Sequence, residues 1–178
     1  MRHFWKTKLN QKGMTLAELL VTMIFIALLG LVVVGGIQAT SRSYRRIVTY
    51  SNAQVVLADT MEVMRDQLLY VDGTAENGTH FSNANFGGFS YKSGSADGKE
   101  GRSISIVYDD TTQPVPLVSE GMMTKNLYAR IGDDGIKVDD NTIQLTIEVC
   151  STGMGETKDK VLASAELIVR PVNRMNGD

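Results

Sequence analysis

The amino-acid sequence predicts an α+β protein, in which one long N-terminal helix packs on an antiparallel β-meander. Two observations predict this fold. Residues 14–71 contain no proline and carry apolar residues at helical spacing. Residues 102–178 instead form short runs of alternating apolar and polar residues, separated by turns rich in Gly, Asp and Asn. Because the helix comes first and the strands follow in succession, the two kinds of structure are expected to form separate layers.

The first part of the predicted helix is apolar on every side. Residues 16–37 give about 22 positions, which at about 1.5 Å each span the roughly 30 Å hydrocarbon core of a bilayer. This run is too long for the apolar stretch of a secretory signal peptide, and no Ala-x-Ala cleavage site follows it. Residues 14–37 are therefore expected to form a retained transmembrane helix.

Charge gives the expected orientation of this helix. Residues 1–12 contain no acid and four basic residues, Arg2, Lys6, Lys8 and Lys12. Basic flanks stay in the cytoplasm, so residues 38–178 are expected outside. The formal net charge of the chain is −2. The mildly acidic remainder has no basic footprint, so nucleic-acid binding is not expected.

Residues 38–71 continue the helix as an amphipathic segment. Apolar residues recur there every three or four positions, at Ile47, Tyr50, Ala53, Leu57, Met61, Met64, Leu68 and Val71. Asp72-Gly73 is a stop signal, which predicts a helix of about 55–58 residues in all. The stripe is expected to pack on the sheet, and a coiled-coil dimer is the alternative use of such a stripe.

Glu18 is an anomaly within the apolar segment. A carboxylate in a membrane-spanning helix costs about 2.5–3.5 kcal/mol on insertion scales, so it needs a partner. One account is a capping box, because Thr15 and Glu18 have the Thr-x-x-Glu spacing. A second account comes from the surrounding sequence, which reads Lys12-Gly13-Met14-Thr15-Leu16-Ala17-Glu18.

This segment resembles the processing motif of type IV pilin precursors, which have a basic leader, a Gly before the cut and a Glu at the fifth mature position. The resemblance implies that prepilin peptidase cuts after Gly13 and methylates the new N-terminus at Met14, where the family most often has Phe. Glycine suits the cut because a side chain would obstruct the close approach of the peptidase. The resemblance also implies that Glu18 pairs with the α-amine of Met14 on a neighbouring subunit, since an unpaired charge is costly in a low-dielectric core.

Two features after the motif gain a role from this resemblance. Pilins commonly lose helix in this region on assembly, often around a Pro that this chain lacks. Gly35-Gly36 is a possible melting point, because each Gly costs a helix about 1 kcal/mol relative to Ala. The alternative is that these small residues allow close helix contact in the membrane. Three arginines follow, Arg42, Arg45 and Arg46, and they are expected to reach lipid headgroups or to form salt bridges between subunits.

Residues 72–101 are rich in Gly, Asn and Ser and are expected to form a long loop, which is the variable region between helix and sheet in pilins. Its aromatic residues are expected to hold it against the sheet: Phe81, Phe86, Phe89 and Tyr91. Asn77 begins an Asn-Gly-Thr sequence, which matches an N-glycosylation acceptor.

Residues 102–178 are expected to form one antiparallel sheet. The strand candidates are residues 103–108, 115–119, 127–131, 136–138, 142–150 and 161–172. Pro116 would confine its short strand to a sheet edge. Gly132-Asp133-Asp134-Gly135 is expected to be a hairpin turn between the third and fourth candidates. The single cysteine, Cys150, excludes a disulfide within the chain and is interpreted as a passive thiol.

No residue pattern predicts an enzyme or a cofactor. The chain has two histidines and lacks nucleophile-elbow, phosphate-loop and Cys-pair motifs. An oxygen-rich cluster gives weak calcium candidates, Asp133, Asp134, Asp139 and Asp140. The order of an EF-hand loop is missing, and turn chemistry explains these residues equally well, so no metal site is expected.

The predicted function is therefore that of a structural subunit of a type IV pilus-like filament, with a minor pilin favoured over a major one. A pseudopilin of a type II secretion or DNA-uptake system is the alternative within the family. A single-pass, membrane-anchored extracellular binding module is the alternative from another class. The expected partners are other subunits, prepilin peptidase, an inner-membrane assembly platform and the membrane. The expected location is the cell membrane and then an extracellular filament or the cell surface.

Overall fold

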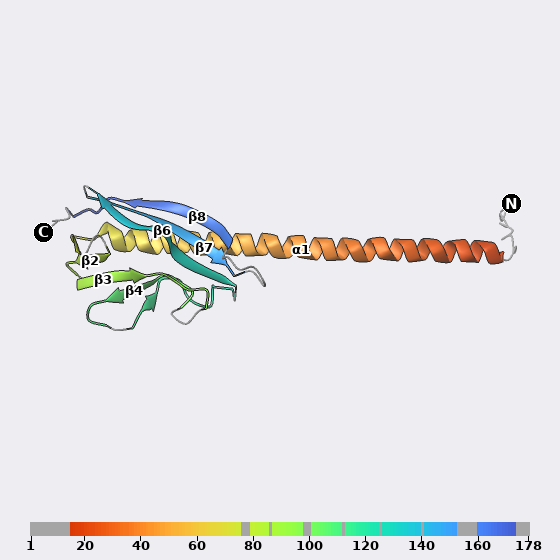
Figure 1. Ribbon diagram of the computed structural model, residues 1–178, viewed down its shortest axis with the longest axis horizontal. Helices are drawn as coiled ribbons and strands as arrows, with labels where there is room; N and C mark the ends of the chain where they lie inside the picture. The colour runs from red at the N-terminus through yellow and green to blue at the C-terminus, as the bar shows by residue number, and fades with distance from the viewer. Residues whose placement is uncertain are drawn as a thin grey trace, which may run out of the picture. The chain divides into compact units, whose positions relative to one another are not determined.

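The computed structural model has the α+β architecture that the sequence predicts (Figure 1). The structure describes residues 15–75, 79–85, 87–97, 101–111, 113–124, 126–139, 141–152 and 160–173. Within these ranges the chain forms one α-helix and eight strands. By its contacts the chain divides into two compact units, Met1–Arg46 and Ile47–Asp178, which are described separately.

The helix α1 (Leu16–Leu69) is unbroken over 54 residues and ends shortly before the predicted stop at Asp72-Gly73. Its buried stripe begins later than predicted, because Ile47 and Tyr50 are 67% and 41% exposed. The buried positions are Ala53, Val56, Thr60, Met64 and Leu68. Thr60 is polar, but its hydroxyl donates to the Val56 carbonyl at 2.6 Å, so burial leaves it satisfied.

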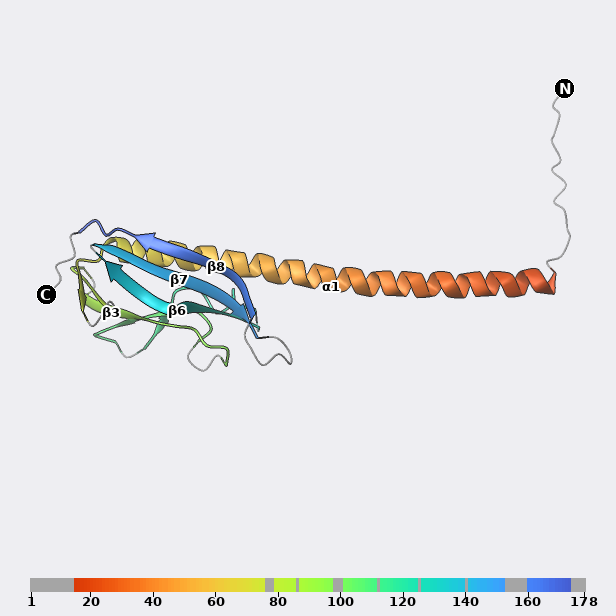
Figure 2. The same ribbon diagram turned by 45° about the horizontal axis from the view of Figure 1, so that its top comes forward.

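Three long antiparallel strands lie along the second half of α1 (Figures 1 and 2). They are β6 (Leu127–Asp139), β7 (Thr142–Ser151) and β8 (Lys160–Val169), with β7 in the centre. Alternate residues of β7 point into the core, as predicted: Ile143, Leu145, Ile147 and Val149 are all buried. The last strand ends at Val169 rather than at residue 172, just before Arg170 and Pro171.

A second antiparallel sheet replaces most of the loop that was predicted over residues 72–101, and that prediction is wrong. Its strands, in spatial order, are β1 (Gly73–Ala75), β2 (His80–Asn83), β3 (Gly87–Lys92), β4 (Ser105–Tyr108) and β5 (Val115–Pro116). The prediction that residues 102–178 form a single sheet is also wrong, because β4 and β5 belong to this second sheet and not to the sheet of β6, β7 and β8. Gly and Ser occupy many positions in these strands, so the alternation of apolar and polar residues is weak in the sequence. Phe81 nevertheless pairs with Phe89, and Phe89 pairs with Tyr108. Cross-strand aromatic pairs of this kind stabilise a sheet.

The sequence predicted some features of β2, β3 and β5 correctly and others not. Pro116 lies in β5 at the edge of its sheet, as predicted. Phe81 and Phe89 are buried and Tyr91 packs against them, but they lie in strands rather than in a loop. Phe86 lies outside the described residues.

The hairpin predicted at Gly132–Gly135 does not form, because these residues lie within the single strand β6. Ile131 pairs with Ile147 and Ile136 pairs with Leu145, so the register shifts between them. The extra residues of β6 are absorbed as a bulge opposite Thr146. The chain instead reverses after Asp139, which pairs with Thr142, and Asn141 in this turn has a φ of 64°.

One hydrophobic core joins the second half of α1 to both sheets. The sheets also meet through backbone bonds, since the Gly94 N–H donates to the Ala129 carbonyl at 3.0 Å and the Ala129 N–H to the Arg102 carbonyl at 2.8 Å. At the end of α1, the Val172 N–H donates to the Leu69 carbonyl at 2.8 Å. This bond satisfies one of the carbonyls that a helix C-terminus leaves without an intrahelical partner.

Candidate functional site at the start of α1

The first turn of α1 is closed by a reciprocal set of hydrogen bonds between Thr15 and Glu18. The Thr15 backbone N–H and hydroxyl donate to the Glu18 carboxylate at 2.9 and 3.1 Å. In return the Glu18 N–H donates to the Thr15 hydroxyl at 3.3 Å. This is a capping box, which satisfies two of the donors that a helix N-terminus leaves free. In the single chain the Glu18 carboxylate therefore has a partner within its own helix.

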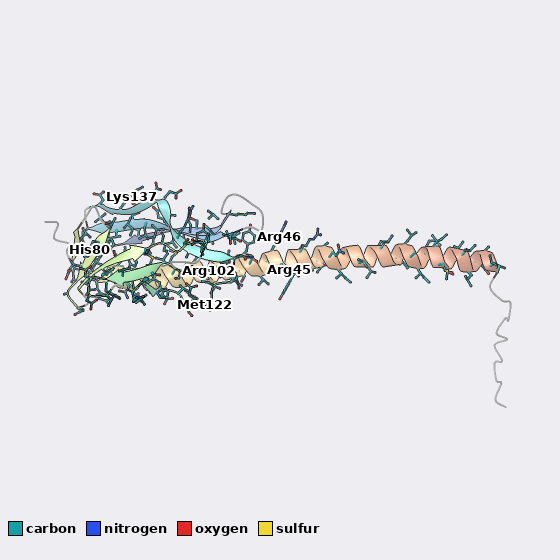
Figure 3. All side chains as sticks on the ribbon, turned by 60° about the horizontal axis from the view of Figure 1, so that its bottom comes forward. Arg45, Arg46, His80, Arg102, Met122 and Lys137 are labelled. Carbon is teal, nitrogen blue, oxygen red and sulfur yellow. The ribbon has the colours of Figure 1, made fainter. Side chains whose placement is uncertain are left out.

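The helix that follows Glu18 presents apolar side chains on all sides (Figure 3). The large apolar side chains of residues 16–37 are from 48% (Leu19) to 79% (Leu16) exposed, and every residue of this segment is exposed, so none of its faces is covered. Within the described ranges, α1 is the one helix long and apolar enough to cross a membrane. A helix of this kind near an N-terminus serves as a membrane anchor or as a signal sequence.

The predicted cleavage and methylation positions, Gly13 and Met14, lie outside the described residues. Gly35 and Gly36 are helical, and an added Cβ at either position would meet nothing within 4 Å. In this single chain the helix is therefore intact at Gly35 and Gly36, where the sequence predicts that it melts on assembly. The Thr40 hydroxyl donates to the Gly36 carbonyl at 2.9 Å.

The calcium candidates do not gather into a metal site within the described residues. Asp133 lies 3.7 Å from the Arg130 guanidinium and Asp134 lies 3.8 Å from the Lys137 ammonium group. Asp139 takes part in the turn between β6 and β7, and Asp140 lies outside the described residues, as does Asn77. The turn interpretation of this cluster agrees with the position of Asp139, but it is wrong for Asp133 and Asp134, which lie within β6.

Sequence patterns did not point to two side-chain contacts between distant segments. Arg130 on β6 donates to the Glu148 carboxylate on β7 from Nε at 2.8 Å and from Nη2 at 2.7 Å. This hydrogen bond raises the pKa of the Arg130 guanidinium above its ordinary value. His80 Nε2 lies 2.9 Å from the nearer Asp109 oxygen. Both pairs join residues far apart in sequence, so only the strand register could have predicted them.

Tyr91 is the member of the aromatic cluster with an unusual environment. Its ring lies 5.6 Å from Phe89 and 6.0 Å from Phe81, both edge-on. The hydroxyl oxygen is buried and has no hydrogen-bond partner among the described residues. Burial raises the pKa of Tyr91 well above its ordinary value, and the nearby Tyr108 raises it further. Such a group destabilises the fold rather than forming a site.

Comparison with known proteins adds no relative to this description. No family model, no curated protein and no solved structure matches the chain.

Proposed function

We propose that this chain is the precursor of a pilin-like structural subunit, which is cut after Gly13 and assembled into a type IV pilus-like filament. The observation that carries the proposal is the position of Glu18. It lies at the start of an uncovered apolar helix, and it follows the sequence Lys12-Gly13-Met14 at the spacing of the prepilin motif.

Cutting after Gly13 would change the electrostatics of this end of the chain. It would remove the basic leader and create a positive α-amine at Met14, next to the Thr15 that now holds the Glu18 carboxylate. In the membrane, that amine and the Glu18 of a neighbouring copy would be opposite charges in a medium of low dielectric. Leaving either one unpaired is costly, so their pairing would fix how neighbouring subunits align.

The rest of the chain fits the same role. The apolar surface of residues 16–37 would be covered first by lipid and then by other subunits. The unit Ile47–Asp178 would lie outside and form the surface of the filament, with prepilin peptidase and an inner-membrane assembly platform acting on the chain before assembly. No catalytic activity is needed for this role.

Mass spectrometry of the N-terminus tests the proposal directly. The chain is produced together with a prepilin peptidase, and the membrane fraction is analysed. A methylated N-terminus at Met14 is expected, and Gly13→Leu should leave the leader attached because a large side chain obstructs the cut. An intact leader on the parent chain would sink the proposal and would favour the anchored binding module. The amount of the chain in sheared filaments then separates a major from a minor subunit, and its absence from them points to a pseudopilin.

A further inference from the structure

The strand β8 has no other strand on its outer side. It is the last strand in the order β6-β7-β8, and within the described residues its backbone bonds to β7 alone. The outer edge of such a strand presents a row of N–H and C=O groups that can pair with the strand of another chain. The edge of β8 is therefore a candidate interaction surface.

The other edges of the two sheets are shorter or better protected. The outer side of β6 bonds to residues 93–102, β5 contains Pro116, and β1 is only three residues long. The strand β8 has ten residues, and its protection lies at its start, in Lys160 and the register shift that follows. Residues 163–169 contain no proline, no lysine and no register shift, so this half of β8 is open to pairing.

Two opposite charges lie on the outward face of this half of β8. Glu166, Ile168 and Arg170 are exposed, while the two residues between them are buried. Glu166 and Arg170 are four positions apart, or about 13 Å along an extended chain, so they are too far apart to pair directly in one copy. The Gln144 amide donates to the Glu166 carboxylate but leaves its negative charge in place. Ile168, between the two charges, is 59% exposed.

An antiparallel second copy of the same strand would bring these charges together. Residues that lie opposite each other in an antiparallel pair share one face of the sheet, with Cβ atoms about 4.5–5.5 Å apart. If a two-fold axis passes beside Ile168, each Glu166 lies opposite the Arg170 of the other copy, and the two Ile168 side chains meet. An axis beside Glu166 would instead place two carboxylates opposite each other. An axis beside Leu167 would place each charge opposite an uncharged residue, so the axis beside Ile168 is the favoured one.

We propose that β8 pairs with the β8 of a second copy, antiparallel and centred on Ile168. The contact runs from Glu166 to Arg170 on both copies, and the same patch serves on each side. Its backbone bonds come from the open edge, and its register comes from the two pairs of opposite charges. Because the contact is short, one such pair is weak, and many copies held side by side on two surfaces would bind far more strongly.

The symmetry of this contact decides which copies can meet. The strand β8 lies along the second half of α1 (Figures 1 and 2). A two-fold axis normal to the sheet therefore sets residues 47–69 of the two copies antiparallel. Subunits of one filament run parallel, so on the proposed function the contact joins copies from two filaments and not neighbours within one.

Disulfide trapping in the full chain, held in detergent, tests the proposal. Ile168→Cys places two thiols opposite each other beside the axis, with Cα atoms about 4.5–5.5 Å apart, which a disulfide can span. Mild oxidation should give a covalent dimer on a non-reducing gel. Ser164→Cys is the matched control, because it is exposed on the same face but its two copies would lie about 26 Å apart. The parent chain, whose Cys150 is buried, gives the background.

Charge reversal then tests the register in the Ile168→Cys chain. Glu166→Arg alone or Arg170→Glu alone sets like charges opposite each other, so the yield of dimer should fall several-fold at low salt. The chain with both changes restores opposite charges and should recover the yield. This recovery also shows that the single variants lose the contact and not the fold.

Equal yields from Ile168→Cys and Ser164→Cys would overturn the proposal, as would a yield that single charge reversal leaves unaltered. A double variant that dimerises no better than the single ones would overturn it too. The assay requires neither leader cleavage nor a filament. A methylated Met14 without the trapped dimer therefore refutes the strand contact alone, and a trapped dimer with an intact leader refutes the filament alone.

Discussion

Thr15 and Glu18 hold one another at the start of α1 through three hydrogen bonds of 2.9 to 3.3 Å. Two roles for Glu18 therefore have to be separated. As a capping residue it stabilises its own helix, and an N-terminal cap contributes about 0.5–2 kcal/mol. As an assembly residue it would need its negative charge for the amine of a neighbour. The two roles differ in one property, because a cap needs an acceptor oxygen while the ion pair needs a charge.

Glu18→Gln is the variant that divides these roles. Gln serves in a capping box as Glu does, so helix content and membrane insertion should stay as in the parent chain. The filament yield should fall strongly, because the neighbour's amine loses its counter-charge in a low-dielectric environment. Glu18→Ala should assemble poorly as well, while leader cleavage continues in both variants. Sheared filaments quantified by immunoblot, together with the N-terminal mass, measure these outcomes.

Thr15→Val is the matched control for that experiment. It removes the hydroxyl that bonds to Glu18 but keeps the carboxylate. Filament yield should remain close to that of the parent chain. If Thr15→Val lowers the yield while Glu18→Gln leaves it unchanged, capping explains the role of Glu18 and the charge pairing is wrong.

The sequence predicts well those features that depend on neighbours within a helical turn. The contact of Thr15 with Glu18 spans three positions, and the unbroken helix follows from its own composition. The stripe also indicates which face of α1 is buried, but it cannot indicate where the covering sheets end. Ile47 and Tyr50 fit the period and are nevertheless exposed, while Thr60 is polar and buried.

Features that depend on pairing between distant segments were missed. Gly132–Gly135 has the chemistry of a turn, yet the residues on both sides of it pair with the same strand β7, so the chain does not reverse there. Phe81 and Phe89 pair within a sheet whose strands are rich in Gly and Ser, so the sequence shows no clear strand pattern there. The bond from Arg130 to Glu148 crosses 18 positions and depends on that same register. Local propensity contains none of this information.

Tyr91→Phe is expected to stabilise the fold. The Tyr91 hydroxyl is buried without a partner among the described residues, and its removal relieves a desolvation cost of about 1–3 kcal/mol. Tyr70→Phe is the control, because Tyr70 is 55% exposed and the change should have no effect. Urea unfolding at neutral pH measures both. Equal or lower stability of Tyr91→Phe would mean that the hydroxyl has a partner, such as a buried water.

The same residue predicts a loss of stability at alkaline pH. Tyr91 titrates near its ordinary pKa of about 10 in the unfolded chain, whereas burial raises its pKa in the folded protein. Below pH 10 both states keep the proton, so stability does not depend on this group. Above about pH 10 the unfolded state loses the proton first, and the free energy of unfolding falls as the pH rises. This part of the pH dependence should disappear in Tyr91→Phe and remain in Tyr70→Phe.

The turn between β6 and β7 should behave as a turn and not as a calcium site. Asn141 has a φ of 64°, a conformation that Gly and Asn adopt easily and β-branched residues do not. Asn141→Gly should therefore keep this backbone conformation without strain, and Asn141→Val should add a strain of about 1–2 kcal/mol. The melting temperature of the parent chain should be the same in millimolar calcium and in a chelator. If calcium raises the melting temperature of the parent chain and Asp139→Asn abolishes that increase, the turn is a metal site instead.

Two glycines predict different costs for the same added methyl group. A Cβ at Gly88 would lie 2.0 Å from an Asp109 carboxylate oxygen and 2.6 Å from His80 Cε1, which both belong to side chains at the surface. Because these side chains can move, Gly88→Ala should lower the free energy of unfolding by about 1 kcal/mol. Most of this loss would come from the broken contact between His80 and Asp109. Asp109→Ala in the same chain should recover part of that cost, because it removes the obstructing atom.

At Gly94 the neighbouring atoms belong to the backbone and cannot move aside. An added Cβ would lie 2.4 Å from the carbonyl oxygens of both Ala129 and Arg102, and these two backbone groups take part in the hydrogen bonds that join the sheets. Gly94→Ala should therefore cost about 3 kcal/mol or more, because the backbone would have to separate to make room. Gly121→Ala is the neutral control, since its nearest neighbour would be 3.7 Å away. Urea unfolding of the three variants should rank Gly94→Ala below Gly88→Ala, and Gly88→Ala below Gly121→Ala. If Gly94→Ala is as stable as Gly121→Ala, the close approach of β6 to the segment around Gly94 is wrong.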